Sequence, residues 1–127
     1  MTVVVGYIPT PIGRAALDAA RTEAERRSRP LIVVNVVRTG DAADPRHADE
    51  SQLEDVRSRM RGARVRVDVR TVEVEHDIAD ALLDVVEEED AGLLVIGIRR
   101  HREVARHLIG ATSQKLLLDA PCDVLVI

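Results

Sequence analysis

The sequence predicts an α/β fold in which a five-stranded, mostly parallel sheet carries helices on both faces. Short runs of Val, Leu and Ile recur along the 127 residues, and segments long enough for helices separate them. This alternation of strand and helix is typical of a parallel sheet that helices cover on both sides. The length fits a single domain that spans residues 1–127.

Five segments are predicted to be strands because they are rich in Val, Leu and Ile and are bounded by turn residues. They are residues 2–7, 31–37, 64–74, 92–98 and 122–127. In the third segment Val65, Val67 and Val69 alternate with charged residues, whereas the others are apolar almost throughout. We therefore expect the third strand to lie at an edge of the sheet, with one wetter face.

Four helices are predicted between these strands, at residues 13–27, 51–61, 77–89 and 111–119. In the first, Ala16, Ala20 and Ala24 repeat on one face, and such small residues let a helix lie close to a sheet. Asp77 can cap the third helix at its start. We interpret the acidic residues 87–90 at its end as a solvated surface.

Composition and charge weigh against several classes of function. The net charge is −4 and Tyr7 is the only aromatic residue, which argues against nucleic-acid binding. The single cysteine, Cys122, allows no internal disulfide and suits a reducing compartment. The sequence shows no signal peptide and no apolar run of about 18 residues. We therefore expect a cytoplasmic protein that contacts neither nucleic acid nor membrane.

Neither a metal site nor a catalytic centre is predicted. The histidines at positions 47, 76, 101 and 107 show no metal-ligand spacing with Cys or carboxylates. The polar stretch Thr39 to Glu50 is expected to be a mobile loop, and it lacks a recognised cation-binding pattern. Because no Gly-x-Ser-x-Gly motif is present, a hydrolase triad has no support and no catalytic residue is assigned.

The most informative segment runs from Gly97 to Ser113. Gly97 and Gly110 enclose a basic loop, and Thr112 and Ser113 follow in the first turn of a helix. Free N–H groups at a helix start attract anions, glycine admits close approach to phosphate oxygens, and arginines add charge. The pattern thus predicts a phosphate cradle. The alternative is that Gly110 forms a turn, the hydroxyls satisfy the helix start and the arginines are solvated.

The predicted fold also indicates where such a cradle would lie. In parallel sheets, ligands bind at the carboxyl ends of the strands, at the point where the strand order reverses. Two loops are expected to meet there, residues 8–13 after the first strand and residues 97–110 after the fourth.

The chain resembles the universal stress protein family over essentially its whole length. The resemblance rests on the segments Leu94 to Arg100, Leu108 to Leu117 and Ala120 to Ile127, the last being the most specific, and on the first two apolar runs. It implies a Rossmann-like domain with a five-stranded parallel sheet, commonly dimeric, that acts in stress tolerance. Some members of the family bind ATP and others do not.

The resemblance also implies a nucleotide site from which this chain departs. Nucleotide-binding members carry a glycine, two residues, a second glycine, nine residues, and then a glycine followed by Ser or Thr. Here Gly97 and Gly110 match the outer glycines, but Arg100 takes the middle position and Ala111 the hydroxyl position. Ile8 stands where such members have Asp. The candidate site comprises Ile8, Pro9, Thr10, Val36, Gly97, Arg99, Arg100, Gly110, Ala111, Thr112 and Ser113.

Three functions follow as hypotheses. The first is a non-enzymatic dimeric regulator or protective factor in the stress response, with a degenerate phosphate loop and protein partners. The second is an adenine-nucleotide module that binds ATP with Mg²⁺ and hydrolyses it slowly if at all. The third is a site for another phosphate-bearing anion. The dimer is expected to form through the strand Cys122 to Ile127, because an edge strand exposes backbone groups that can pair with a second chain.

Overall fold

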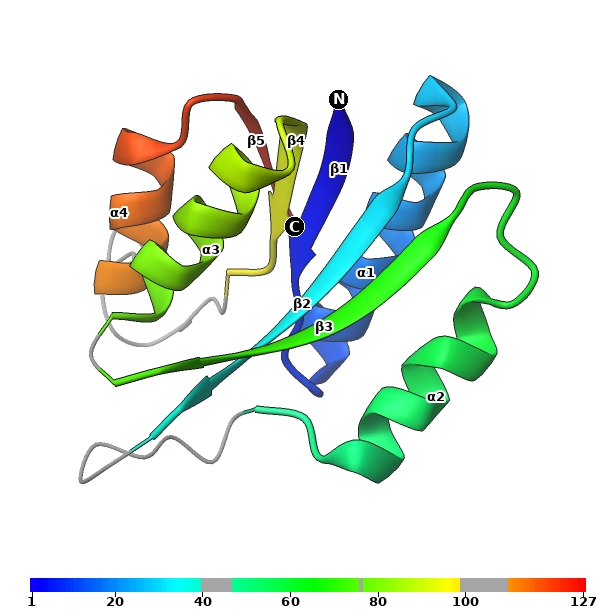
Figure 1. Cartoon of the computed structure of the whole chain (residues 1–127), viewed down its shortest axis with the longest axis horizontal. Coiled ribbons are helices and arrows are strands. Elements are labelled where there is room, and N and C mark those ends of the chain that lie inside the picture. Colours follow the sequence, from blue (N-terminus) through cyan, green and yellow to red (C-terminus); the bar gives the residue numbers. More distant parts are fainter. Residues whose placement is uncertain (40–46, 76, 99–109) are drawn as a thin grey trace.

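The computed structural model describes residues 1–39, 47–75, 77–98 and 110–127. Nine elements alternate along these ranges, and their strands form one parallel sheet of order β3-β2-β1-β4-β5 (Figure 1). The strands are β1 (Thr2–Gly6), β2 (Leu31–Arg38), β3 (Val67–Val74), β4 (Ala91–Ile96) and β5 (Asp123–Val126). The helices are α1 (Pro11–Arg27), α2 (Glu50–Met60), α3 (Ile78–Glu88) and α4 (Ala111–Asp119). The predicted α/β class and the edge position of β3 are confirmed.

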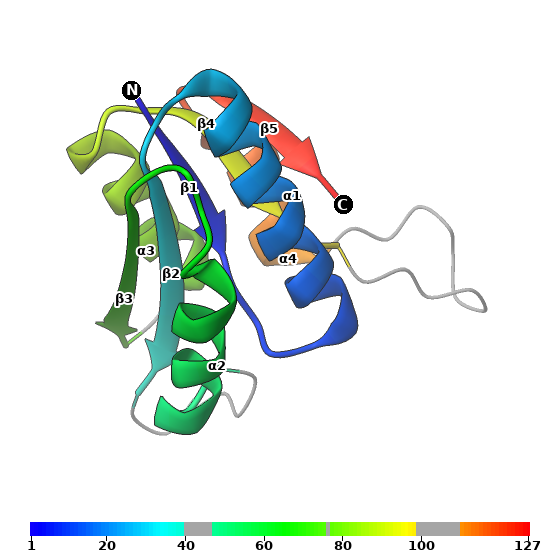
Figure 2. The ribbon, with the colours of Figure 1, turned by 90° about the vertical axis from the view of Figure 1, so that its right-hand side faces the viewer.

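Helices cover both faces of the sheet, in two pairs (Figure 2). Successive residues of β1 point to opposite faces, so Val3 and Val5 pack toward α1 and α2, whereas Val4 packs toward α3 and α4. The alanines at positions 16, 20 and 24 of α1 are fully buried against the sheet, as their spacing predicts. The two cores are almost entirely aliphatic, and Tyr7 is the only aromatic residue in them.

Most predicted bounds of helices and strands agree with the structure to within two residues, but the predicted start of the third strand is three residues too early. The third strand begins at Val67 and not at Arg64. The backbone N–H of Arg64 donates instead to Glu25 Oε2 of α1, at 2.8 Å. This hydrogen bond directs the chain toward the end of α1 before it enters the sheet.

The acidic end of α3 also needs a correction. Asp77 caps the helix as predicted, since its carboxylate accepts a hydrogen bond from the Ala79 N–H at 2.9 Å. Glu89, however, is not simply part of a solvated surface. Its Oε1 lies 2.7 Å from Nη1 of Arg70 on β3, and Arg70 also pairs with Asp68. These carboxylates hold the pKa of Arg70 above its ordinary value.

The strand order reverses between β1 and β4. From β1 the chain moves through α1 to β2 on one side, and from β4 it moves toward β5 on the other. The carboxyl ends of β1 and β4 therefore lie side by side, which is where ligands bind in sheets of this kind.

None of the helices in the described ranges is long and apolar enough to cross a membrane.

Candidate functional site

The first residue after β4, Gly97, meets the segment that follows β1 at the carboxyl edge of the sheet, whereas positions 99–109 of the predicted loop lie outside the described residues. A Cβ atom added to Gly97 would lie 3.0 Å from Cγ1 and 3.1 Å from the carbonyl oxygen of Ile12. Gly97 thus packs directly on the first turn of α1. Its neighbours are fixed as well: the Ile127 N–H donates to the Ile96 carbonyl at 2.9 Å, and the Ile98 N–H donates to the Ile127 carbonyl at 3.1 Å. The last residue of the described chain therefore braces the exit of β4.

The loop after β1 is a tight turn through Ile8, Pro9 and Thr10. The Thr10 N–H donates to the Ile8 carbonyl at 2.8 Å, and Thr10 Oγ1 accepts a hydrogen bond from the Gly13 N–H at 3.1 Å. Thr10 is the N-cap of α1, and Pro11 begins the helix, two residues earlier than predicted. Because the hydroxyl only accepts in this cap, its proton remains available to a ligand. Ile8 is 38% exposed.

Gly110 is the N-cap residue of α4, and no described atom constrains it. Its φ of −57° suits any residue, and no described atom lies within 4 Å of a Cβ built on it. Neither packing nor backbone conformation in the described ranges therefore requires glycine here. No side-chain cap hydrogen bond is found at the start of α4 among the described residues.

The structure places the other candidate residues unevenly. Val36 lies half-buried near the end of β2 and packs on the same core as α3 and α4. Ala111, Thr112 and Ser113 form the first turn of α4. Arg99 and Arg100 lie outside the described residues, as do positions 40–46 of the loop Thr39 to Glu50. The part of the site built from described residues therefore offers the Thr10 hydroxyl, the start of α4 and exposed apolar side chain at Ile8.

Two features of the described residues limit the chemistry. No group of three or more His, Cys, Asp or Glu in them could hold a metal ion. Cys122 is partly buried, and burial raises the pKa of its thiol, which disfavours the reactive thiolate.

Lys115 ties the candidate cradle to the start of α3, a contact that sequence reasoning missed. Its Nζ lies 2.8 Å from Asp77 Oδ2 and 2.7 Å from Asp80 Oδ1. The hydrogen bonds to these carboxylates raise the pKa of Lys115, and the Lys115 ammonium lowers the pKa of Asp77. The only signal in the sequence was that Lys115 is the single lysine of a chain rich in arginine. The contact fixes α4 one turn after Gly110.

We expect Lys115→Met to destabilise the fold modestly at neutral pH, because both carboxylates lose their cation while remaining part-exposed. Because the pKa of Asp77 is lower in the folded protein than its ordinary value of 3.8, the ion pair stabilises the fold fully at any pH above about 3.8. This contribution is lost as the pH falls through the lowered pKa. The stability difference between variant and wild type should therefore shrink below about pH 4. Urea denaturation at pH 7 and pH 3 measures it. Gln114→Met is the matched control. If the stability difference between Lys115→Met and wild type were the same at pH 7 and pH 3, the stabilising role of the Lys115 ion pairs would be contradicted.

Asn35 is a second residue that sequence reasoning missed. It is 1% exposed, and its side chain makes two hydrogen bonds with the backbone of Ala48. The signal was present, because Asn35 is the one polar residue inside the apolar run 31–37. Ala48 immediately precedes Asp49, the N-cap of α2, so Asn35 fixes the point at which the chain returns from the loop after β2.

These features define the class of protein: a parallel α/β domain with a candidate ligand site at the strand-order reversal, where Gly97 packs on the first turn of α1. Comparison with known proteins identifies the family. The model of the universal stress protein family matches residues 1–127, so the chain belongs to this family, as the resemblance implied.

Relatives and solved structures agree with this assignment. A universal stress protein of Mycolicibacterium smegmatis is 39% identical over 126 residues, which cover 98% of this chain and 95% of the relative. One from Mycobacterium tuberculosis is 32% identical over 139 residues, which cover 99% of this chain but only 48% of that protein.

Two solved structures carry adenine nucleotides. A universal stress protein from Archaeoglobus fulgidus in complex with dAMP has a TM-score of 0.76 and 25% identity, covering 100% of this chain and 97% of that one. A universal stress protein in complex with cAMP has a TM-score of 0.80, covering 100% of this chain and 96% of that one. At 22% identity, the latter likeness concerns the fold alone.

Proposed function

We propose that this universal stress protein is a non-enzymatic, dimeric regulator or protective factor of the stress response, with a degenerate phosphate-binding loop. The observation that carries the proposal is the chemistry of the switch-point site. An apolar side chain, Ile8, stands 38% exposed where a nucleoside would need polar partners, and Ala111 brings no hydroxyl to the first turn of α4. Each missing hydrogen bond to a charged group weakens binding by about 1.5–3 kcal/mol.

The edge position of β5 supports a dimer through residues 122–127. Its outer side has no partner strand among the described residues, and Val126 is 41% exposed. On α4, Leu118 is 75% exposed and Leu117 is 39% exposed. A second copy that pairs with this strand would cover backbone groups and apolar surface together. Since Ile127 braces the exit of β4, such pairing would also hold Gly97 in place. A cytoplasmic location and further protein partners remain predictions.

A second candidate function is adenine-nucleotide binding at the same place. It is favoured by Gly110, which neither packing nor conformation requires in the described ranges, and by the uncapped first turn of α4. The dAMP complex of the relative from Archaeoglobus fulgidus also supports it. In this case ATP, with Mg²⁺, would place its phosphates at Gly110 to Ser113 and its base toward Val36.

Titration calorimetry of ATP with Mg²⁺ at moderate salt separates the two candidates. No heat and no thermal shift at about 1 mM ATP supports the degenerate site, whereas binding in the micromolar range supports the nucleotide module. Release of inorganic phosphate, measured in parallel, would contradict a non-enzymatic role.

If ATP binds, we expect Gly110→Val to weaken it about tenfold or more, because the side chain would block the approach of phosphate to the start of α4. Gly62→Val is the matched control, since Gly62 lies in the turn after α2 and only Arg21 Nη2 comes within 4 Å of an added Cβ. Arg100→Ala tests the basic loop in the same assay. Equal affinities for the Gly110 and Gly62 variants would show that the nucleotide binds elsewhere.

A further inference from the structure

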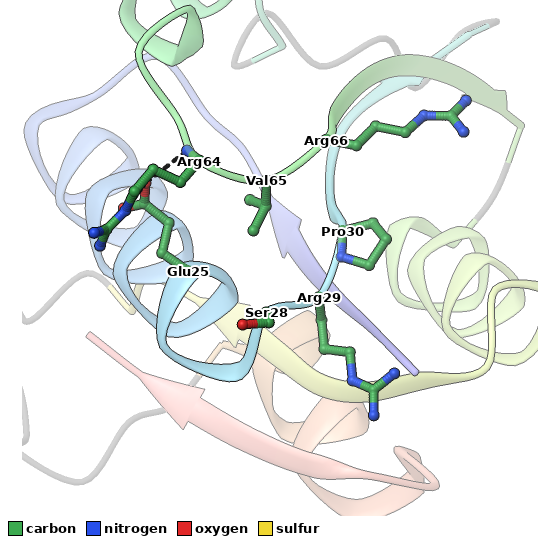
Figure 3. Close-up of a pocket in the computed structure, with 7 residues that line it drawn as sticks. All are labelled: Glu25, Ser28, Arg29, Pro30, Arg64, Val65 and Arg66. Atoms are coloured by element: carbon green, nitrogen blue, oxygen red, sulfur yellow. Dashed lines mark hydrogen bonds and ion pairs between the residues drawn. The ribbon is translucent and has the colours of Figure 1, made fainter.

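A hollow lies at the amino ends of β2 and β3, at the opposite end of the strands from the switch point. It has a volume of about 480 Å³ and forms where α1 ends and the chain enters β2 and β3 (Figure 3). Seven residues line it: Glu25, Ser28, Arg29, Pro30, Arg64, Val65 and Arg66. Pro30 and Val65 occupy its middle, and the three arginines stand around them.

Positive charge exceeds negative charge around this hollow. Glu25 is its one carboxylate, and it is shared between Arg64, with Nε at 3.5 Å, and Arg21, also at 3.5 Å. Arg29 and Arg66 have no acidic partner among the described residues. The contacts of Glu25 with Arg64 and Arg21 lower its pKa, and the largest cause is the hydrogen bond from the Arg64 backbone N–H. Such a local surplus of positive charge, in a chain of net charge −4, attracts anions to the hollow.

Part of the backbone around the hollow is already hydrogen-bonded within the protein. Ser28 adopts a left-handed conformation with φ of 53°, and its N–H donates to the Glu25 carbonyl at 3.2 Å. The Arg29 N–H donates to the Ala24 carbonyl at 3.0 Å. These two bonds close the end of α1 and reduce the exposed negative charge of its last carbonyls. Among the described residues, the side-chain donors that remain for a ligand are the guanidinium groups of Arg29 and Arg66 and the Ser28 hydroxyl.

The directions of the arginines indicate the shape of the ligand. In Figure 3 the side chain of Arg64 points toward Glu25, whereas those of Arg29 and Arg66 point away from it and from each other. One small tetrahedral anion would have to draw these two guanidinium groups together against their mutual repulsion. An extended anion with a charge on every unit needs no such rearrangement, and guanidinium groups pair with phosphate oxygens through two parallel hydrogen bonds.

We propose that this hollow binds a linear oligophosphate chain, with Arg29 and Arg66 as its principal partners, Ser28 as an additional donor and Pro30 and Val65 as the floor. The site is separate from the switch point and does not depend on whether a nucleotide binds there.

Titration with tripolyphosphate and with a longer linear polyphosphate at about 0.15 M salt tests the proposal. We expect saturable binding, and the double variant Arg29→Gln/Arg66→Gln should weaken it about tenfold or more. The matched control is Arg26→Gln/Arg57→Gln, which removes the same charge from exposed arginines paired with carboxylates outside the hollow. The control should change the affinity less than about threefold.

Several outcomes would overturn the proposal. The first is no binding at about 1 mM tripolyphosphate, and the second is an equal loss in both double variants, which would indicate non-specific attraction. Polyglutamate or oligothymidylate binding as tightly as polyphosphate would point to another class of partner. Loss of polyphosphate binding in Gly110→Val would place the phosphates at the switch point instead. Amide chemical shifts confined to residues 28–30 and 64–66 would support the proposed location.

Discussion

Gly13→Ala should lower the free energy of unfolding by about 2–4 kcal/mol. A Cβ atom at this position would collide with the carbonyl oxygen of Ile8 and would lie 2.8 Å from its carbonyl carbon. Backbone atoms cannot rotate away as the end of a side chain can, so the turn through Ile8 or the start of α1 must move. Intrinsic helix propensity predicts the opposite sign, since Ala is favoured over Gly in a helix by about 1 kcal/mol. The sign of the effect is therefore diagnostic.

Urea denaturation of Gly13→Ala beside Gly62→Ala and Gly110→Ala measures the effect. An added Cβ at Gly62 meets only Arg21 Nη2, at 3.5 Å, and one at Gly110 meets no described atom, so both controls should stay within about 1 kcal/mol of wild type. If Gly13→Ala is as stable as the controls, the close packing of Ile8 on α1 is wrong. If it unfolds more readily and binding at the switch point also weakens, the turn that carries Thr10 is part of the site.

The elements of the fold could be predicted because their signals are local. The run of Val residues in β1, the alanine spacing in α1 and the cap at Asp77 each act within a few residues of the chain. The alternation of Val with charged residues in β3 also predicted its edge position. The sequence also predicted that the segments after β1 and β4 would meet, and Gly97 does pack on Ile12.

The contacts that could not be predicted join residues distant in the sequence. The carboxylate of Glu25 takes the N–H of Arg64, 39 positions away, and so delays the start of β3. Lys115 reaches Asp77, 38 positions away, and fixes α4 near the cradle. No periodicity or turn pattern encodes such pairs, because they depend on how helices and strands pack together. Gly13 shows the same limit, since a glycine inside a helix pattern does not reveal which carbonyl lies against it.

Replacement of the buried amide of Asn35 is the second change for which we expect a large loss of stability. Its Nδ2 donates to the Ala48 carbonyl at 2.9 Å, and its Oδ1 accepts from the Ala48 N–H at 2.9 Å. Asn35→Leu keeps a similar volume but leaves both backbone groups of Ala48 without their partner in a buried place. Since each unsatisfied buried group costs about 1–3 kcal/mol, we expect a loss of about 2–4 kcal/mol in the free energy of unfolding.

Thr71→Val is the matched control for this change. It removes only the longer contact, 3.4 Å from Asn35 Nδ2 to Thr71 Oγ1, and should cost less than about 1 kcal/mol. Hydrogen exchange at Ala48 and in the first turn of α2 locates the effect. If exchange in Asn35→Leu is faster there while the amides of the sheet stay protected, Asn35 fixes the start of α2 by holding Ala48. Uniformly faster exchange would mean that Asn35 supports the whole core, because β2 lies between β1 and β3 and its loss of order would spread to both.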